Sequence, residues 1–134
     1  MTRGRWRVAT ALVACLATLA VIGTYPVFSQ TWDEPATLAT GMEWLSTGRY
    51  HYEAQHPPLA RVASAALPYL RGARSLGSRS MYDEGRALLG DGAQYRRTLF
   101  LARLGMLPFL WLLLVTCALW GARIGTRFVK GLLH

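Results

Sequence analysis

Two long runs without a charged side chain constrain this chain more than any other feature of its sequence. The first extends from Val8 to Ser29 and the second from Leu104 to Gly121. Each run is close to the ~20 residues that cross a hydrocarbon core of ~30 Å as a helix. The sequence therefore predicts an all-α membrane protein with two transmembrane helices, at 8–29 and 99–121, of which Pro108 should kink the second.

The distribution of charge predicts the orientation of the chain in the membrane. The formal net charge is +8, and all 7 acidic residues lie in the loop between the spans, at 30–98. The excess positive charge therefore belongs to the N-terminus at 1–7 and the tail at 122–134. Because short cytoplasmic segments are enriched in Lys and Arg, we expect both termini in the cytoplasm and the loop outside it. The expected location is a bacterial inner (plasma) membrane, since arginine greatly outnumbers lysine, as in GC-rich bacterial genomes.

Several functions are disfavoured by the same sequence. Nucleic-acid binding is not expected, because there is no basic face with interleaved aromatic residues. Cys15 and Cys117 each lie within an apolar run, which favours membrane-buried thiols over a disulfide or a metal pair. The spacing of Glu53 and His56 fits a metal site only on a helix, and two prolines follow His56. The sequence therefore indicates neither a metal nor a cofactor.

The N-terminal apolar segment has two further interpretations. It is preceded by arginines and could be a secretory signal cleaved after Val27-Phe28-Ser29. Leu12-Val13-Ala14-Cys15 also fits a bacterial lipoprotein box. The run is long for a signal and remains apolar well beyond Cys15, which favours an uncleaved span.

The loop is expected to contain helices. Asp33 is a good N-cap, and Pro35 suits a first helical turn. Leu38, Met42 and Leu45 recur at i, i+4 and i+7 and give one apolar face. We interpret such segments as amphipathic helices that lie along the membrane surface. The expected helices of the loop cover about 34–46, 58–70 and 82–89.

Adjacent carboxylates, Asp33 and Glu34, directly follow the first apolar run. Asp33 can serve as an N-cap, a catalytic group or both. At a helix start the two side chains point roughly 100° apart. They therefore cannot face each other across a glycosidic bond at the ~5 to 9 Å of a hydrolase pair. A single carboxylate suits a transferase instead, in which it orients or deprotonates an acceptor hydroxyl or amine.

Arginines near the membrane interface are candidates for binding an anionic substrate group such as a phosphate, through paired hydrogen bonds. The ordinary alternative is an arginine on a helix surface or among lipid headgroups. With His56, the candidate substrate-binding residues are Arg61, Arg97 and Arg103.

Four short motifs, in this order relative to the spans, resemble the N-terminal portion of the C-fold glycosyltransferases. The motifs are Asp33-Glu34, Gly48-Arg49-Tyr50, His56-Pro57-Pro58-Leu59 and Arg103-Leu104. This superfamily includes the protein mannosyltransferases and the lipid A aminoarabinose transferase. The resemblance implies a hexosyl or pentosyl transferase that takes a sugar from a polyprenyl phosphate carrier and gives it to an extracytoplasmic acceptor. It further implies that Asp33 is the catalytic base, with Glu34 beside it.

The number of spans departs from this family, whose members have many more. Two helices cannot enclose a lipid-phosphate pocket, so we expect a truncated or fragmentary glycosyltransferase that is inactive as this chain alone. The alternative is a small non-catalytic two-span interaction protein whose loop contacts a partner or membrane lipid. The sequence identifies neither the sugar nor the acceptor.

Overall fold

The structure is a computed structural model that describes residues 3–132, with side chains described for residues 4–124. The chain is all-α, as the sequence predicts, and divides into two compact units. One unit comprises Met1–Val21 with Leu107–His134, and the other comprises Ile22–Met106. The basic side chains of Arg3, Arg127 and Lys130, on which the expected orientation partly depends, lie outside the described residues.

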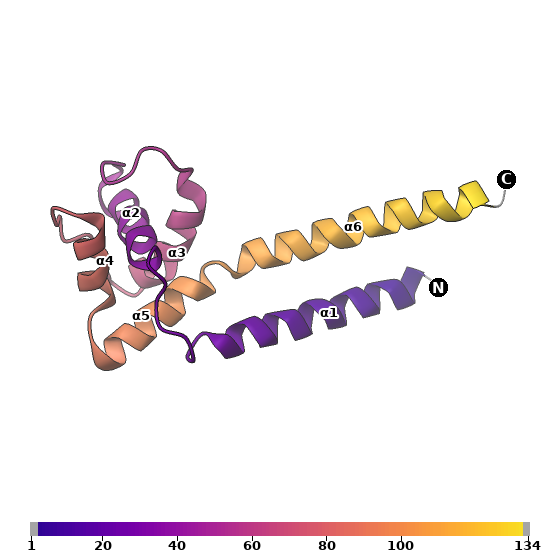
Figure 1. The fold of residues 1–134 in the computed structure, drawn as a ribbon, viewed down its shortest axis with the longest axis horizontal. Coiled ribbons are helices and arrows are strands. Elements are labelled where there is room, and N and C mark those ends of the chain that lie inside the picture. The colour runs from indigo at the N-terminus through magenta and orange to yellow at the C-terminus, as the bar shows by residue number, and fades with distance from the viewer. Residues whose placement is uncertain (1–2, 133–134) are drawn as a thin grey trace. The chain divides into compact units, whose positions relative to one another are not determined.

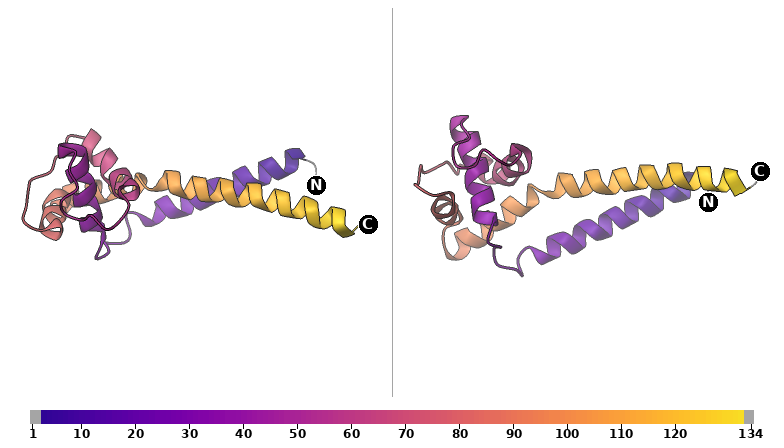
Figure 2. Two further views of the ribbon diagram at one scale, coloured as in Figure 1. Left: turned by 90° about the horizontal axis from the view of Figure 1, so that it is seen from above. Right: turned by 45° about the horizontal axis from the view of Figure 1, so that its top comes forward.

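The first unit consists of α1 (Arg3–Thr24), up to Val21, and α6 (Leu107–Leu132). The two helices run alongside each other with opposite chain directions (Figure 2). The indole Nε1 of Trp111 donates a hydrogen bond of 3.0 Å to the Thr18 hydroxyl between them. By length and composition, two helical stretches are able to cross a membrane, Gly4–Thr24 and Gly92–Ile124.

The limits of the long helices differ from the expected spans at 8–29 and 99–121. α1 ends at Thr24, because Pro26 has no amide hydrogen to continue the helix. The second apolar segment begins as α5 (Gly92–Leu104), turns at residues 105–106 and continues as α6. Pro108 explains this turn, since its ring would clash with the Leu104 carbonyl in a continuous helix. The expected kink is therefore a break between two helices.

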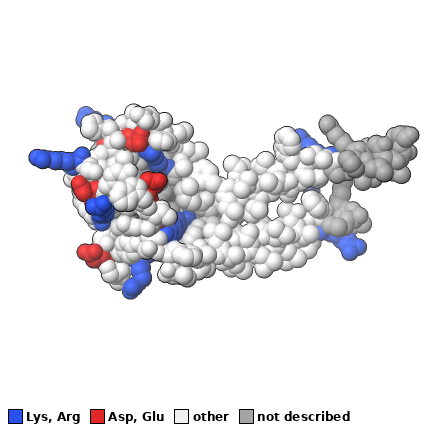
Figure 3. All heavy atoms as spheres, viewed as in Figure 1, with Lys and Arg blue, Asp and Glu red and all other residues white. Residues whose placement is uncertain are grey.

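The second unit contains α2 (Glu34–Thr47), α3 (Pro58–Leu70), α4 (Met81–Leu89) and α5. Three of these helices lie within one residue of the ranges expected for the loop. α2 lies between α3 and α4, and α5 packs against both of those helices (Figure 1). Charged side chains gather over this unit, whereas long stretches of α1 and α6 carry none (Figure 3). The core consists of Leu38, Ala39, Met42, Ala65, Leu88, Leu89, Leu99 and Ala102.

The burial of α2 corrects its interpretation as an amphipathic surface helix. Its buried positions include Leu38 and Met42 but also Ala36, Thr40 and Gly41, which lie around most of its circumference. These additional positions are small or form a hydrogen bond within the helix, as Thr40 does to the Ala36 carbonyl at 2.9 Å. Small side chains let neighbouring helices approach closely on several sides, so α2 is the central helix of a packed unit.

Glycines mark the closest helix contacts of this unit. A β-carbon added at Gly41 would overlap the Arg61 carbonyl of α3, and one added at Gly85 would overlap the Pro35 carbonyl. Both obstacles are backbone atoms, which cannot move as a flexible side chain can. We therefore expect Gly85→Ala to lower the free energy of unfolding by about 1–3 kcal/mol through overpacking.

The measurement for Gly85→Ala is denaturant unfolding of the full chain in detergent, followed by circular dichroism. Gly23→Ala is the control, because nothing lies within 4 Å of a β-carbon at Gly23. That control should leave the unfolding free energy unchanged or raise it slightly, since alanine favours helix over glycine. Equal stability of the two variants would contradict the close α2–α4 contact.

Two buried carboxylates hold the loops of the unit. Glu43 Oε2 accepts hydrogen bonds of 3.0 Å from the amides of both His51 and Tyr52. Glu84 is fully buried and accepts hydrogen bonds from the Leu76 and Ser78 amides, at 2.6 and 3.0 Å, and from the Ser75 hydroxyl. These bonds replace the water that a carboxylate would otherwise bind, and they fix the α2–α3 and α3–α4 connections.

The Glu84 carboxylate should make the stability of this unit depend on acid. Burial raises the pKa of Glu84, but the hydrogen bonds from residues 75–78 outweigh burial and hold the pKa below its ordinary value of 4.5. Its stabilisation is therefore complete above about pH 5 and is lost as the pH falls through the lower pKa of the folded protein. The free energy of unfolding is measured between about pH 6 and pH 3. It should fall less steeply with acid in Glu84→Gln than in the wild type, and as steeply as in the wild type in Asp83→Asn, at an exposed position.

Candidate functional site

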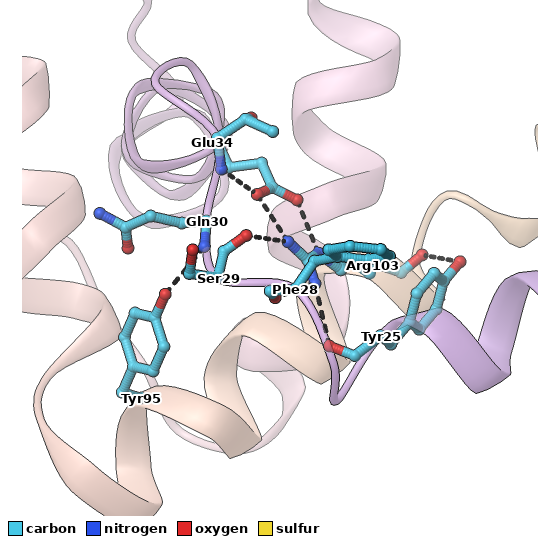
Figure 4. Close-up of polar contacts among 8 residues, drawn as sticks. Tyr25, Phe28, Ser29, Gln30, Glu34, Tyr95 and Arg103 are labelled. Carbon is cyan, nitrogen blue, oxygen red and sulfur yellow. Dashed lines mark hydrogen bonds and ion pairs between the residues drawn. The ribbon is translucent and has the colours of Figure 1, made fainter.

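Arg103 on α5 and Glu34 at the start of α2 form a two-point ion pair (Figure 4). Arg103 Nε donates to Glu34 Oε1 at 2.7 Å, and Nη2 donates to Oε2 at 2.9 Å. Glu34 Oε2 also accepts a hydrogen bond of 2.7 Å from the Thr31 amide. The structure thus brings together two candidate site residues that lie far apart in the sequence, and it joins α5 to the segment before α2.

The remaining donors of Arg103 hold the turn that follows α1. Nη1 donates to the carbonyls of Tyr25 and Phe28, at 2.9 and 2.8 Å, and Nη2 donates to the Ser29 carbonyl at 2.9 Å. The Tyr25 hydroxyl donates in return to the Arg103 carbonyl at 3.1 Å. A guanidinium has five N–H donors, and here each has a protein acceptor. Arg103 therefore could contact a phosphate only by giving up one of these bonds.

Glu34 remains a carboxylate over the physiological pH range. Burial raises its pKa, but the hydrogen bonds from Arg103 and Thr31, with the positive charge of Arg103, outweigh burial and hold the pKa below its ordinary value. A carboxylate held in this way is a poor general base, since a proton on it would break the ion pair. Of the two adjacent acids, Glu34 has a structural role that the sequence did not indicate.

Asp33 occupies the N-cap position of α2, as expected, but its side chain accepts no capping hydrogen bond. Its backbone carbonyl accepts the first helical bond, from the Thr37 amide at 2.9 Å. The side chain is exposed, and no hydrogen bond or ion pair engages its carboxylate among residues 4–124. Beside it, exposed Trp32 lies against Tyr82 of α4, with ring centroids 5.7 Å apart. Asp33 is thus a carboxylate available to a ligand, next to an aromatic surface.

His56 and Arg61 form a second cluster around Glu53, where the α2–α3 loop meets α3. Glu53 Oε1 lies 3.4 Å from His56 Nδ1, and Oε2 lies 3.7 Å from Arg61 Nη2. Tyr50 joins the cluster, because its hydroxyl lies 3.4 Å from both Arg61 Nη1 and the His56 carbonyl. A hydrogen bond from the Gln55 amide is the main cause of a lowered pKa for Glu53, and His56 and Arg61 contribute. The sequence indicated Glu53 only as a possible metal partner of His56 and Tyr50 only as part of a motif, and the structure places both in this cluster.

Arg97 belongs to neither cluster. It is exposed on α5 and, with its neighbour Arg96, lines an open cavity of about 630 Å³. The six candidate residues therefore form two groups and two separate positions in the Ile22–Met106 unit. Glu34 pairs with Arg103, His56 lies with Arg61, and Asp33 and Arg97 each remain without an ionic partner among the described side chains.

No family model matches the chain, and neither a curated protein nor a solved structure shows significant similarity to it.

Proposed function

We propose that the protein is a membrane glycosyltransferase component in which Asp33 is the catalytic base. The observation that supports this proposal best is the state of Asp33 itself. Its carboxylate is exposed and has no partner among the side chains that the structure describes, and it lies nine positions beyond the end of the first apolar helix, beside a Glu34 that is already engaged. An acid without a structural partner at this place is available for proton transfer at a membrane surface.

In this proposal the sugar moves from a polyprenyl phosphate to an acceptor hydroxyl or amine. Asp33 accepts the acceptor's proton while the acceptor's oxygen or nitrogen forms a bond to the anomeric carbon. The bond from that carbon to the phosphate oxygen breaks, and the polyprenyl phosphate leaves with the electron pair. It therefore needs no proton from an acid. An open cavity of about 390 Å³ is lined by Thr31 and Glu34, which lie within two positions of Asp33 in the chain, although Asp33 itself does not line it.

The remaining candidate residues have distinct parts in the proposal. His56 and Arg61 both lie next to the Glu53 carboxylate, so one substrate could contact both of them. Arg97 has an exposed guanidinium that can meet a phosphate. Arg103 becomes a positioning residue, because it fixes the segment that carries Asp33 rather than offering unused donors.

The proposed location is the bacterial plasma membrane, with both termini cytoplasmic and the Ile22–Met106 unit outside. Two helical stretches of sufficient length and the basic terminal segments support this topology. A membrane-impermeant maleimide tests it in intact cells. In a variant that lacks Cys15 and Cys117, a cysteine placed at exposed Arg79 should react, and one placed at Arg5 should not.

Sugar transfer is tested in native membranes, which also supply any further part of the transferase that this chain needs, and in matching membranes without this chain. The membranes receive polyprenyl phosphate that carries a radiolabelled sugar, and label outside the lipid fraction is measured. The proposal expects labelled product in proportion to the amount of protein. The transfer rate is also measured in membranes with the same amount of the Gly85→Ala variant. A lower rate than that of the wild type would show that transfer needs the intact fold. A rate equal to that of membranes without the protein would refute the proposal for the sugars tested.

A non-catalytic interaction protein is the second candidate function. It is favoured by large apolar side chains that remain exposed on the Ile22–Met106 unit, with exposed fractions of 67% for Leu59 and 76% for Leu70. Light scattering of the purified protein in detergent tests self-association through this surface. If Leu59→Ser/Leu70→Ser turns an oligomer into a monomer while no sugar transfer is found, this second function is favoured.

A further inference from the structure

The open cavity beside Arg96 and Arg97 has two walls of different origin. One wall is the turn at residues 25–29, and the other is the first part of α5, from Gly92 to Phe100. Much of its surface is apolar, and exposed Val27 and Phe28 contribute to it. Its volume of about 630 Å³ lies within the range of small-molecule binding pockets. It therefore offers an apolar surface large enough for part of an acyl chain.

This cavity, called the groove from here on, carries positive charge from two arginines. Arg96 and Arg97 are both exposed, and neither forms an ion pair within the described part of the chain. In contrast, Arg103, two turns further along α5, has an acceptor for each of its donors. The groove also includes Gly92 and Ala93 in the first turn of α5, where Asp91 accepts no side-chain capping bond. The first amides of α5 therefore donate no capping bond to the Asp91 side chain, although the nearby Asp91 carboxylate offsets part of their positive potential.

The chain itself connects the groove to the apolar helices. Tyr25, in one wall, directly follows the candidate span Gly4–Thr24, and the other wall lies in the helical stretch Gly92–Ile124. A ligand with an anionic head and an apolar tail matches this combination of features. Arginine pairs with phosphate oxygens through two hydrogen bonds, and apolar chains cover surface such as that of Val27 and Phe28.

We propose that this groove binds an anionic glycerophospholipid of the surrounding membrane as a structural lipid. Its phosphate lies against Arg96, Arg97 and the first turn of α5, and an acyl chain lies along the turn at residues 25–29. This lipid is neither the sugar donor nor the acceptor, so the inference does not require the proposed transfer activity. It replaces one part of that proposal, because it assigns Arg97 to a lipid of the bilayer and not to the substrate phosphate.

The experiment uses the full chain reconstituted in vesicles of phosphatidylglycerol and phosphatidylcholine in equal amounts. After extraction in a mild non-ionic detergent, native mass spectrometry counts the lipids that remain bound, since the two lipids differ in mass. The wild-type protein should retain phosphatidylglycerol in preference to phosphatidylcholine. Arg96→Gln/Arg97→Gln should reduce that retention by about fivefold for each arginine removed.

Two further variants distinguish binding of the lipid in the groove from non-specific attraction of the lipid by positive charge. Arg71→Gln/Arg79→Gln removes the same charge from exposed positions outside the groove and should retain the lipid. Ala93→Trp keeps the charge but fills the groove, and it should lose the lipid. Circular dichroism must show the same helix content in all variants.

Four results would overturn the inference. Equal losses in the two double-arginine variants would show attraction by net charge alone. Full retention by Ala93→Trp, or equal retention of both lipids by the wild type, would show that the groove does not select an anionic lipid. Displacement of phosphatidylglycerol by an equal amount of polyprenyl phosphate would instead assign the groove to the sugar donor.

Discussion

Asp33→Asn should lower the rate of sugar transfer by about 10²- to 10⁴-fold, the usual contribution of a general base. Asparagine has nearly the same size but accepts no proton at neutral pH. The Asp33 side chain makes no capping bond, so its replacement removes no contact that holds α2. The fold and the Glu34–Arg103 ion pair should therefore survive, and the loss should appear in the chemical step.

The measurement combines initial transfer rates in membranes with binding of the labelled donor. Asp33→Asn should reduce the rate and leave donor binding within about twofold of the wild type, since the base acts on the acceptor. Exposed Asp83→Asn is the matched control, because it removes the same charge from α4 near the Trp32–Tyr82 contact. Equal rates for wild type and Asp33→Asn would remove Asp33 from catalysis and favour the interaction protein.

The helices of the loop could be predicted from sequence because local signals determine where they begin and end. Pro35 and Pro58 lie in first turns, Gly48 ends α2 in a left-handed conformation with φ of 67°, and Ser80 caps α4 by accepting a bond from the Tyr82 amide. These effects act within a few residues, which is the range that a single sequence reveals.

The burial of α2 could not be predicted in the same way. The apolar face of Leu38 and Met42 is visible in the sequence, but alanine, threonine and glycine look the same on a buried and a surface helix. What buries these small residues is the close approach of the Arg61 and Pro35 carbonyls to Gly41 and Gly85. Such contacts depend on helix placement, which periodicity does not specify.

The site was predicted in part for a related reason. The position of Asp33 directly before a helix and after an apolar run is a local feature, so the sequence indicates its N-cap position, whereas its catalytic role stays a prediction. The partners of Arg103 are three carbonyl oxygens and a glutamate that lie more than 60 positions earlier in the chain. Backbone acceptors leave no mark on residue identity. An arginine that satisfies them therefore looks the same in sequence as one that awaits a phosphate.

The role of Arg103 leads to the largest expected effect on stability. Arg103→Met keeps an unbranched side chain of similar length but removes every donor. It leaves the partly buried Glu34 carboxylate, with 29% of its side chain exposed, and the carbonyls of residues 25, 28 and 29 without their donor. Breaking a fully buried pair costs about 3–5 kcal/mol. Because Glu34 is partly solvated, we expect a loss of about 2–4 kcal/mol in the free energy of unfolding.

Denaturant unfolding of the full chain in detergent measures this loss, and Glu34→Gln separates its two parts. In Glu34→Gln the guanidinium keeps its carbonyl acceptors, so this variant should lose less stability than Arg103→Met. The double variant should be more stable than the sum of the two losses predicts, because a neutral glutamine without Arg103 leaves no unpaired charge. Additive losses would show that Glu34 and Arg103 act separately. In the wild type, the lowered pKa of Glu34 means that stability falls as the pH drops below about 4.5. In Arg103→Met the pKa of Glu34 should rise toward its ordinary value. The fall of stability with acid that is due to Glu34 should therefore become smaller.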